Sequence, residues 1–170
     1  PFLDINGNGI WDEEENFEDS NQNGYWDEAE DFGLASEYRE VSRVVILGMG
    51  GSAIGGDLLG DLMSLEETPQ VEVCRDFRLP RYVGPDTLVL ACSYSGNTAE
   101  TLAAFKQARS QEAKLVVVTK GGLLGMEAEK FDLPRFTVNY EGEPRSAIGY
   151  SFLVPLRIMS NLNLMPTKSD

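Results

Sequence analysis

The chain has 170 residues, of which 42% are hydrophobic, and a formal net charge of −14 at pH 7. Residues 1–37 hold twelve acidic side chains and no Lys or Arg, so residues 38–170 carry a net charge of only about −2. This distribution predicts a near-neutral globular domain behind an acidic N-terminal segment. The chain offers neither a basic surface for nucleic acid nor an apolar run that could span a membrane, so we expect neither partner.

The acidic segment is a tandem repeat with a period of 15 residues. Each copy reads D-x-N-x-N-G-x-x-D-x-x-E, which is the pattern of a twelve-residue, EF-hand-like calcium loop. Two complete copies predict two bound Ca²⁺ ions. The ligands expected for the first ion are Asp4, Asn6, Asn8, the carbonyl of Ile10, Asp12 and Glu15. Those expected for the second are Asp19, Asn21, Asn23, the carbonyl of Tyr25, Asp27 and Glu30.

The spacing of the two loops distinguishes between kinds of calcium protein. Only three residues separate the loops, which leaves no room for the flanking helices of an ordinary EF-hand pair. A disordered acidic tail is the alternative, but Trp11 and Trp26 argue against it because such tails are poor in aromatic residues. Residues 1–33 resemble the tandem calcium-loop repeats of bacterial extracellular proteins. They are therefore predicted to form a small calcium-binding appendage, and this resemblance implies an extracellular setting.

Strand-like and helical patterns alternate after Gly33. Strands are predicted at 43–47, 70–74, 87–92, 114–119 and 135–139, and helices at 52–65, 97–110, 122–130 and 146–162. This alternation predicts an α/β fold with a doubly wound parallel sheet of five strands, as in flavodoxin-like proteins.

The first predicted helix has Ser52 as its expected N-cap, and its large apolar residues are expected to share a buried face. These residues are Ile54, Leu58, Leu59, Leu62 and Met63. In the second predicted helix, Leu102, Phe105 and Ala108 are expected to point inward.

Two turns rich in glycine and hydroxyl groups follow the first and third predicted strands, at residues 48–55 and 93–98. Ligands of parallel sheets bind at the carboxyl ends of strands, and helix N-termini attract anions. The sequence therefore predicts an anion site, with a phosphate as the expected anion, where four hydroxyl groups converge: Ser52, Ser93, Ser95 and Thr98. Taken singly, each of these could equally be a helix cap.

Two other glycine motifs are weaker explanations of the first turn. A dinucleotide fingerprint would need an acidic residue about 20 positions further on at a strand end, and Asp76 lies beyond that place. A phosphate-binding Walker loop needs a lysine after its last glycine, and no lysine follows.

Four motifs in order resemble the first SIS (sugar isomerase) domain of the bifunctional phosphoglucose/phosphomannose isomerase family. They read G-M-G-G-S-A-I-G-G-D, S-Y-S-G-N-T-x-E-T-L, V-V-x-T-x-G-G and P-R-x-A-x-G-Y, and the resemblance covers about residues 38–165. It implies that the four hydroxyl groups hold a sugar phosphate and that the backbone of Gly50 and Gly51 lines the sugar. It also implies that Arg145 assists ring opening and polarises the enediolate, without any cofactor in this domain.

The resemblance also implies that part of the catalytic machinery is missing. In the family, a glutamate and a histidine from a second SIS domain move the protons, with the histidine supplied by a partner subunit. This chain contains no histidine and ends where that second domain would begin. Glu143 offers a carboxylate, but it is not the family's base.

Two hypotheses follow from this incomplete site. In the first, the chain is the phosphosugar-binding part of a glucose-6-phosphate/mannose-6-phosphate isomerase that is inactive alone and forms a homodimer in its full-length form. In the second, it is a non-catalytic phosphosugar-binding module with a calcium-dependent head. Sugar-phosphate metabolism implies a cytoplasmic location, which conflicts with the extracellular setting of the calcium repeats. The two cysteines, Cys74 and Cys92, fall in predicted strands and are expected to be buried and unpaired.

Overall fold

The computed structural model describes residues 34, 36–64, 69–140, 142 and 144–165. The chain divides into two compact units, residues 1–34 and 35–170, and the fold below is that of the second unit. The predicted calcium loops and their ligands lie outside the described residues.

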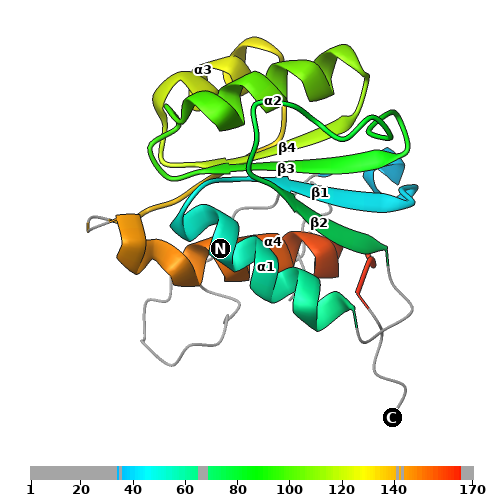
Figure 1. Ribbon diagram of the computed structural model, residues 1–170, viewed down its shortest axis with the longest axis horizontal. Helices are drawn as coiled ribbons and strands as arrows, with labels where there is room; N and C mark the ends of the chain where they lie inside the picture. The colour runs from blue at the N-terminus through cyan, green and yellow to red at the C-terminus, as the bar shows by residue number, and fades with distance from the viewer. Residues whose placement is uncertain (1–33, 35, 65–68, 141, 143, 166–170) are drawn as a thin grey trace, which may run out of the picture. The chain divides into compact units, whose positions relative to one another are not determined.

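The second unit is built on a parallel sheet of five strands in the order β2-β1-β3-β4-β5 (Figure 1). The strands are β1 (Arg43–Leu47), β2 (Gln70–Cys74), β3 (Thr87–Ser93), β4 (Lys114–Thr119) and β5 (Arg135–Thr137). This is the flavodoxin-like order, in which the direction of winding reverses between β1 and β3. The predicted fold class is confirmed.

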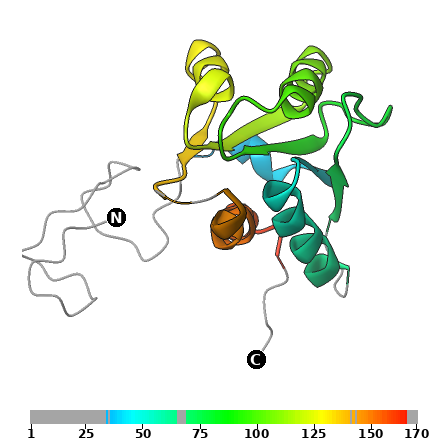
Figure 2. The ribbon, with the colours of Figure 1, turned by 60° about the vertical axis from the view of Figure 1, so that its left-hand side comes forward.

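Helices cover both faces of the sheet (Figures 1 and 2). The elements are the 3₁₀ helix η1 (Ser36–Arg39), α1 (Gly51–Met63), α2 (Ala99–Ser110), α3 (Gly122–Lys130), the 3₁₀ helix η2 (Pro144–Ala147) and α4 (Ile148–Asn161). Helices α1 and α4 pack on one face, and α2 and α3 on the other. Among the described helices, none is long and apolar enough to cross a membrane.

The core lies on both sides of β3, which is buried along its whole length. Strands covered on both faces are apolar without alternation, as Val89 and Leu90 illustrate, because neither face meets water. On the α2 and α3 side, Phe105 and Leu124 are fully buried against the sheet. Of the three residues of α2 predicted to point inward, Phe105 and Ala108 are fully buried, and Leu102 is partly buried against the same core.

The predicted buried face of α1 is wrong for three of its five residues. Ile54, Leu58 and Leu62 are 47%, 47% and 43% exposed. The face that packs inward consists mostly of small residues: Ala53, Gly55, Gly56, Leu59 and Met63. Small residues allow a close approach to neighbouring backbone, so the spacing of the large apolar residues indicated the wrong face.

Helices α1 and α4 touch through their backbones at Gly55. A Cβ atom at Gly55 would lie 2.3 Å from the carbonyl carbon and oxygen of Ser151, so only glycine fits there. The Ser151 Oγ atom lies 2.9 Å from the Gly51 carbonyl oxygen of α1 and 2.8 Å from the Ile148 carbonyl oxygen of its own helix, so its one proton can be donated to either. This contact fixes the first turn of α1 against the first turn of α4.

The ends of two C-terminal elements differ from the prediction. Strand β5 stops at Thr137 instead of residue 139, and α4 begins at Ile148 after the 3₁₀ helix η2 instead of at residue 146. The chain between β5 and α4 is held mainly by side chains, as described below, and side-chain contacts over long sequence distances are absent from a local pattern.

Candidate functional site

The two glycine-rich turns leave the same edge of the sheet. Leu47 at the end of β1 pairs with Ala91 of β3, so both turns begin at the point where the winding of the sheet reverses. Gly48 brings them into contact, because a Cβ atom there would lie 3.1 Å from the Ser52 carbonyl carbon and 3.3 Å from the Cys92 carbonyl oxygen.

Gly50, not Ser52, occupies the N-cap position of α1. Its φ of 53° and ψ of −126° suit glycine, since L side chains rarely adopt a positive φ. The Gly50 carbonyl accepts hydrogen bonds from the N–H groups of Ala53 and Ile54, each at 3.1 Å. The predicted cap at Ser52 is therefore wrong, and Ser52 lies in the first turn of the helix, beside the cavity described below.

In the second turn, two hydroxyl groups meet. The Ser93 Oγ atom lies 3.0 Å from Thr98 Oγ1 and accepts the Gly96 N–H at 3.1 Å, and Ser93 is 3% exposed. Thr98 is the N-cap residue of α2, but its side chain makes no capping hydrogen bond. Ser95 is exposed, and its Oγ accepts the Asn97 N–H at 3.2 Å. Ser93 and Thr98 thus form a joined pair, while Ser95 lies at the surface.

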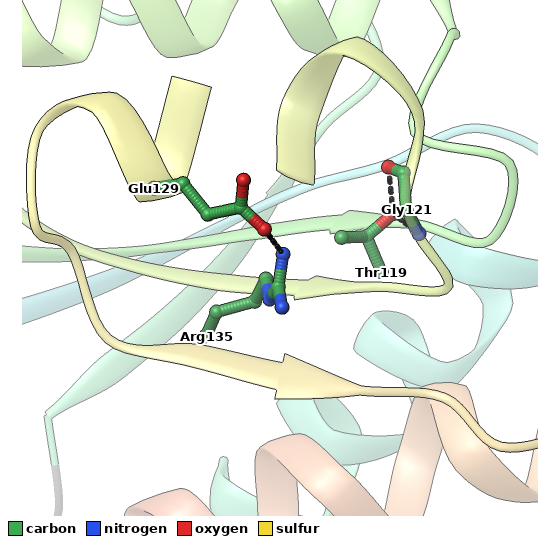
Figure 3. A network of polar contacts seen from close by, with 4 residues as sticks. All are labelled: Thr119, Gly121, Glu129 and Arg135. Carbon is green, nitrogen blue, oxygen red and sulfur yellow. Dashed lines mark hydrogen bonds and ion pairs between the residues drawn. The ribbon is translucent and has the colours of Figure 1, made fainter. Parts of the chain in front are cut away.

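A third turn, between β4 and α3, braces the second one. The Asn97 Oδ1 atom accepts the Leu123 N–H at 3.0 Å, and the Leu124 N–H donates to the Gly96 carbonyl at 2.9 Å. Thr119 closes the third turn with two hydrogen bonds to Gly121, as Figure 3 shows. The second turn is therefore held by two hydrogen bonds from the start of α3.

Nearby, Arg135 of β5 forms an ion pair with Glu129 of α3 at 2.5 Å, which is also drawn in Figure 3. The pair connects the end of α3 to the edge strand. Because both side chains are well exposed, this pair contributes only modestly to stability.

A small cavity of about 20 Å³ lies between the first two turns and the segment of residues 138–151. Its volume suits about one water molecule, so a larger ligand would extend out of its mouth. The lining residues are Gly51, Ser52, Cys92, Ser93, Tyr94, Val118, Val138, Ala147, Tyr150 and Ser151. Of the predicted site residues, the structure brings Gly51, Ser52 and Ser93 to this cavity. Thr98 adjoins it through Ser93, whereas Gly50 and Ser95 are exposed outside its lining.

Arg145 lies in η2, directly before α4. Ala147 of η2 and Tyr150 of α4 line the cavity, so Arg145 lies two residues before a lining residue. Glu143 lies outside the described residues.

Sequence reasoning missed the aromatic part of the site. Tyr94 and Tyr150 line the cavity, and the Tyr94 hydroxyl donates to the carbonyl oxygen of Tyr140 at 2.7 Å. The position of Tyr94 between Ser93 and Ser95 was the one available signal. Its partner lies 46 residues further along the chain, beyond any local pattern.

The electrostatics of the cavity suit an anion. The N-termini of α1 and α2 both face this edge of the sheet, and helix N-termini carry partial positive charge. Burial raises the pKa of Cys92 to about 12, so the thiol that lines the cavity stays neutral at physiological pH. The described lining residues include the Ser52 and Ser93 hydroxyl groups and no carboxylate, which suits a phosphate at two helix N-termini.

Comparison with known proteins gives consistent relatives. The sequence pattern of the SIS domain family matches residues 37–132. A bifunctional phosphoglucose/phosphomannose isomerase from Caldicellulosiruptor bescii is 44% identical over 131 residues, which are 77% of this chain and 39% of that relative. A D-glucosamine-6-phosphate 4-epimerase from Sulfolobus acidocaldarius is 32% identical over 123 residues, which are 72% of this chain and 38% of that relative.

The fold has solved counterparts as well. The crystal structure of a hypothetical protein from Thermus thermophilus matches with a TM-score of 0.56 and 30% identity, over 74% of this chain and 35% of that one. The chain spans about two fifths of the length of the curated relatives described above.

Proposed function

Because the chain belongs to the SIS domain family, we propose that it binds a sugar phosphate where β1 and β3 end. The observation that carries the proposal is the pair of helix N-termini at one sheet edge, with the Ser93 and Thr98 hydroxyl groups 3.0 Å apart between them. Hydroxyl and backbone donors at helix N-termini favour a phosphate group. Ser52, Ser93, Ser95 and Thr98 are the proposed phosphate ligands, and Gly50 and Gly51 are the proposed sugar contacts.

The proposed substrates are the 6-phosphates of glucose, mannose and fructose, and the proposed reaction is their aldose–ketose isomerisation. In this role, Arg145 would stabilise the negative charge that develops on the enediolate, as a fixed cation can. Moving a proton between C1 and C2 also needs a general base with a pKa near the working pH. The chain contains no histidine, and the described residues that line its cavity include no carboxylate. We therefore propose that this chain alone binds substrate but does not turn it over, and that a longer, homodimeric form in the cytoplasm does.

The test is titration calorimetry on the purified chain with glucose 6-phosphate, fructose 6-phosphate, mannose 6-phosphate and free glucose. The expected result is that the phosphates bind and that glucose binds far more weakly. Ser93→Ala should weaken phosphate binding, whereas Ser110→Ala, an exposed serine at the end of α2, should not. Equal affinity for glucose and its 6-phosphate would contradict the proposal.

The second candidate function is a non-catalytic phosphosugar-binding module with a calcium-dependent head, and the tandem loop repeat favours it. We propose that residues 1–33 bind two Ca²⁺ ions through the loop positions given above. Trp11 and Trp26 should report calcium binding by fluorescence in a sample first treated with chelator. If millimolar calcium produced neither a spectral change nor heat of binding, the proposed calcium binding would be refuted. Isomerase activity when the chain is combined with the remaining portion of a relative would favour the first function.

A further inference from the structure

Tyr94 stands between two proposed phosphate ligands, but its hydroxyl group binds elsewhere. It donates to the Tyr140 carbonyl at 2.7 Å and lies 3.2 Å from the Gly142 carbonyl, while the residue itself lines the cavity. We propose that Tyr94 is a positioning residue that ties the far wall of the site, residues 138–140 and 142, to the phosphate-binding turn. The proposal rests on the proposed function, because it concerns how the same site holds the sugar part of its ligand.

The far wall is held by side chains where the sheet ends. The ladder of backbone hydrogen bonds reaches Val138, whose N–H donates to the Thr119 carbonyl at 3.1 Å. Beyond it, the Asn139 carbonyl accepts from the Tyr150 hydroxyl at 3.4 Å. The Tyr140 carbonyl accepts from both the Tyr94 hydroxyl and the Lys120 Nζ atom, the latter at 3.2 Å. Of these contacts, the one from Tyr94 is the shortest.

The three tyrosines also stack in sequence. The rings of Tyr94 and Tyr140 meet edge-on with centroids 6.4 Å apart, and those of Tyr140 and Tyr150 lie 6.0 Å apart. The backbone N–H of Lys120 donates to the Tyr94 carbonyl at 3.0 Å, so Lys120 also connects Tyr94 to Tyr140. The hydroxyl group of Tyr94 can therefore be removed while its ring keeps its neighbours.

This arrangement separates the two parts of the ligand. In the lining, Ser52 and Ser93 belong to the two glycine-rich turns, whereas Val138, Ala147 and Tyr150 belong to the chain that follows β5. A phosphate held by the hydroxyl groups leaves its sugar facing the mouth and the far wall. Loosening the wall should therefore weaken sugar contacts without changing phosphate contacts.

The test compares Tyr94→Phe with Tyr82→Phe in the full chain. Tyr82 is a matched control, because its hydroxyl also donates to a single partner, Glu72, but next to the opposite ends of β1 and β2. Affinities for fructose 6-phosphate and for inorganic phosphate are measured by calorimetry. In Tyr94→Phe, the affinity for fructose 6-phosphate should fall about 3- to 10-fold, because the bound sugar must then order a wall that the lost hydrogen bond no longer holds, and that for inorganic phosphate should stay within about 2-fold. Tyr82→Phe should change neither affinity.

Amide hydrogen exchange of the ligand-free protein gives a second readout. Tyr94→Phe should speed exchange at Val138, whose N–H donates to the Thr119 carbonyl at the start of the far wall, and leave the amides of β3 and β4 unchanged. Equal losses for both ligands, or unchanged exchange at the far wall, would overturn the role of Tyr94. Failure of the unaltered chain to bind either ligand would instead overturn the proposed function, and with it the role of Tyr94 toward the sugar.

Discussion

Replacing Gly55 by alanine is the most direct test of how α1 and α4 are joined. The added Cβ would lie 2.3 Å from the Ser151 carbonyl group, whereas real Cβ contacts stay above 3.0 Å. The carbonyl atoms belong to the backbone, so a side-chain rotation cannot relieve the overlap, and the two helices must separate by at least 0.7 Å. That separation also lengthens the contact between the Ser151 hydroxyl and the Gly51 carbonyl, and leaves the Ile148 carbonyl as the hydroxyl's acceptor.

The expected cost follows from opposing contributions. Overpacking typically costs about 1–3 kcal/mol. Weakening the Ser151 hydrogen bond costs about 0.5–1.5 kcal/mol. The better helix propensity of alanine returns about 1 kcal/mol. Gly55→Ala should therefore lower the free energy of unfolding by about 1–3 kcal/mol.

Gly149→Ala is the matched control, since a Cβ at this glycine in α4 meets nothing within 4 Å. It should raise stability by about 0.5–1 kcal/mol. Urea unfolding followed by circular dichroism would measure the free energy of unfolding of both variants. In a separate thermal unfolding experiment, each kcal/mol should shift the melting temperature by about 2–4 °C. If Gly55→Ala were as stable as Gly149→Ala, the backbone contact between α1 and α4 would be refuted.

Three further predictions concern the site. Ser95→Ala and Thr98→Ala should each make the free energy of sugar-phosphate binding less favourable by about 1–3 kcal/mol in calorimetry, because each removes a charge-assisted hydrogen bond. Unchanged affinity in either variant would exclude that residue from the phosphate site. In a coupled assay, the purified chain should convert glucose 6-phosphate to fructose 6-phosphate only at the background rate. Robust turnover that Arg145→Ala abolishes would instead show that this chain contains a general base, and Glu143 would be the first residue to test. In a Cys74→Ala variant, Cys92 should react with a thiol reagent only on unfolding. Fast labelling of Cys92 in the folded protein would contradict its burial. Because folding raises the pKa of Cys92 from 9.0 to about 12, the unfolded chain loses this proton at a lower pH than the folded protein, and the free energy of unfolding should fall above pH 9.

The sequence predicted most of the scaffold, because β1, β2 and β4 carry their signal in consecutive residues. Each of these strands was predicted with the bounds that the structure shows. The reversal between β1 and β3 then puts both glycine-rich turns at one edge, and this follows from topology alone.

The failures have a common physical origin, which is contact over long sequence distances. The inward face of α1 is selected by backbone approach at Gly55, so the larger Leu58 is exposed. Ser52 was a reasonable cap by residue type, but the positive φ of Gly50 starts the helix earlier. The tie between Tyr94 and Tyr140 joins residues 46 positions apart, so nothing in either local segment indicates it.

The bracing of the second turn by the third has a thermodynamic consequence for ligand binding. The hydrogen bonds from Leu123 to Asn97 and from Leu124 to Gly96 fix the backbone around Ser93 and Thr98 before any ligand arrives. Ordering a free loop on binding would lower affinity by its lost conformational entropy, and a preorganised turn avoids that loss. The entropy of this turn is therefore already lost during folding, so the affinity of its hydroxyl groups for an anion depends on the stability of α3 and β4 as much as on the hydroxyl groups themselves.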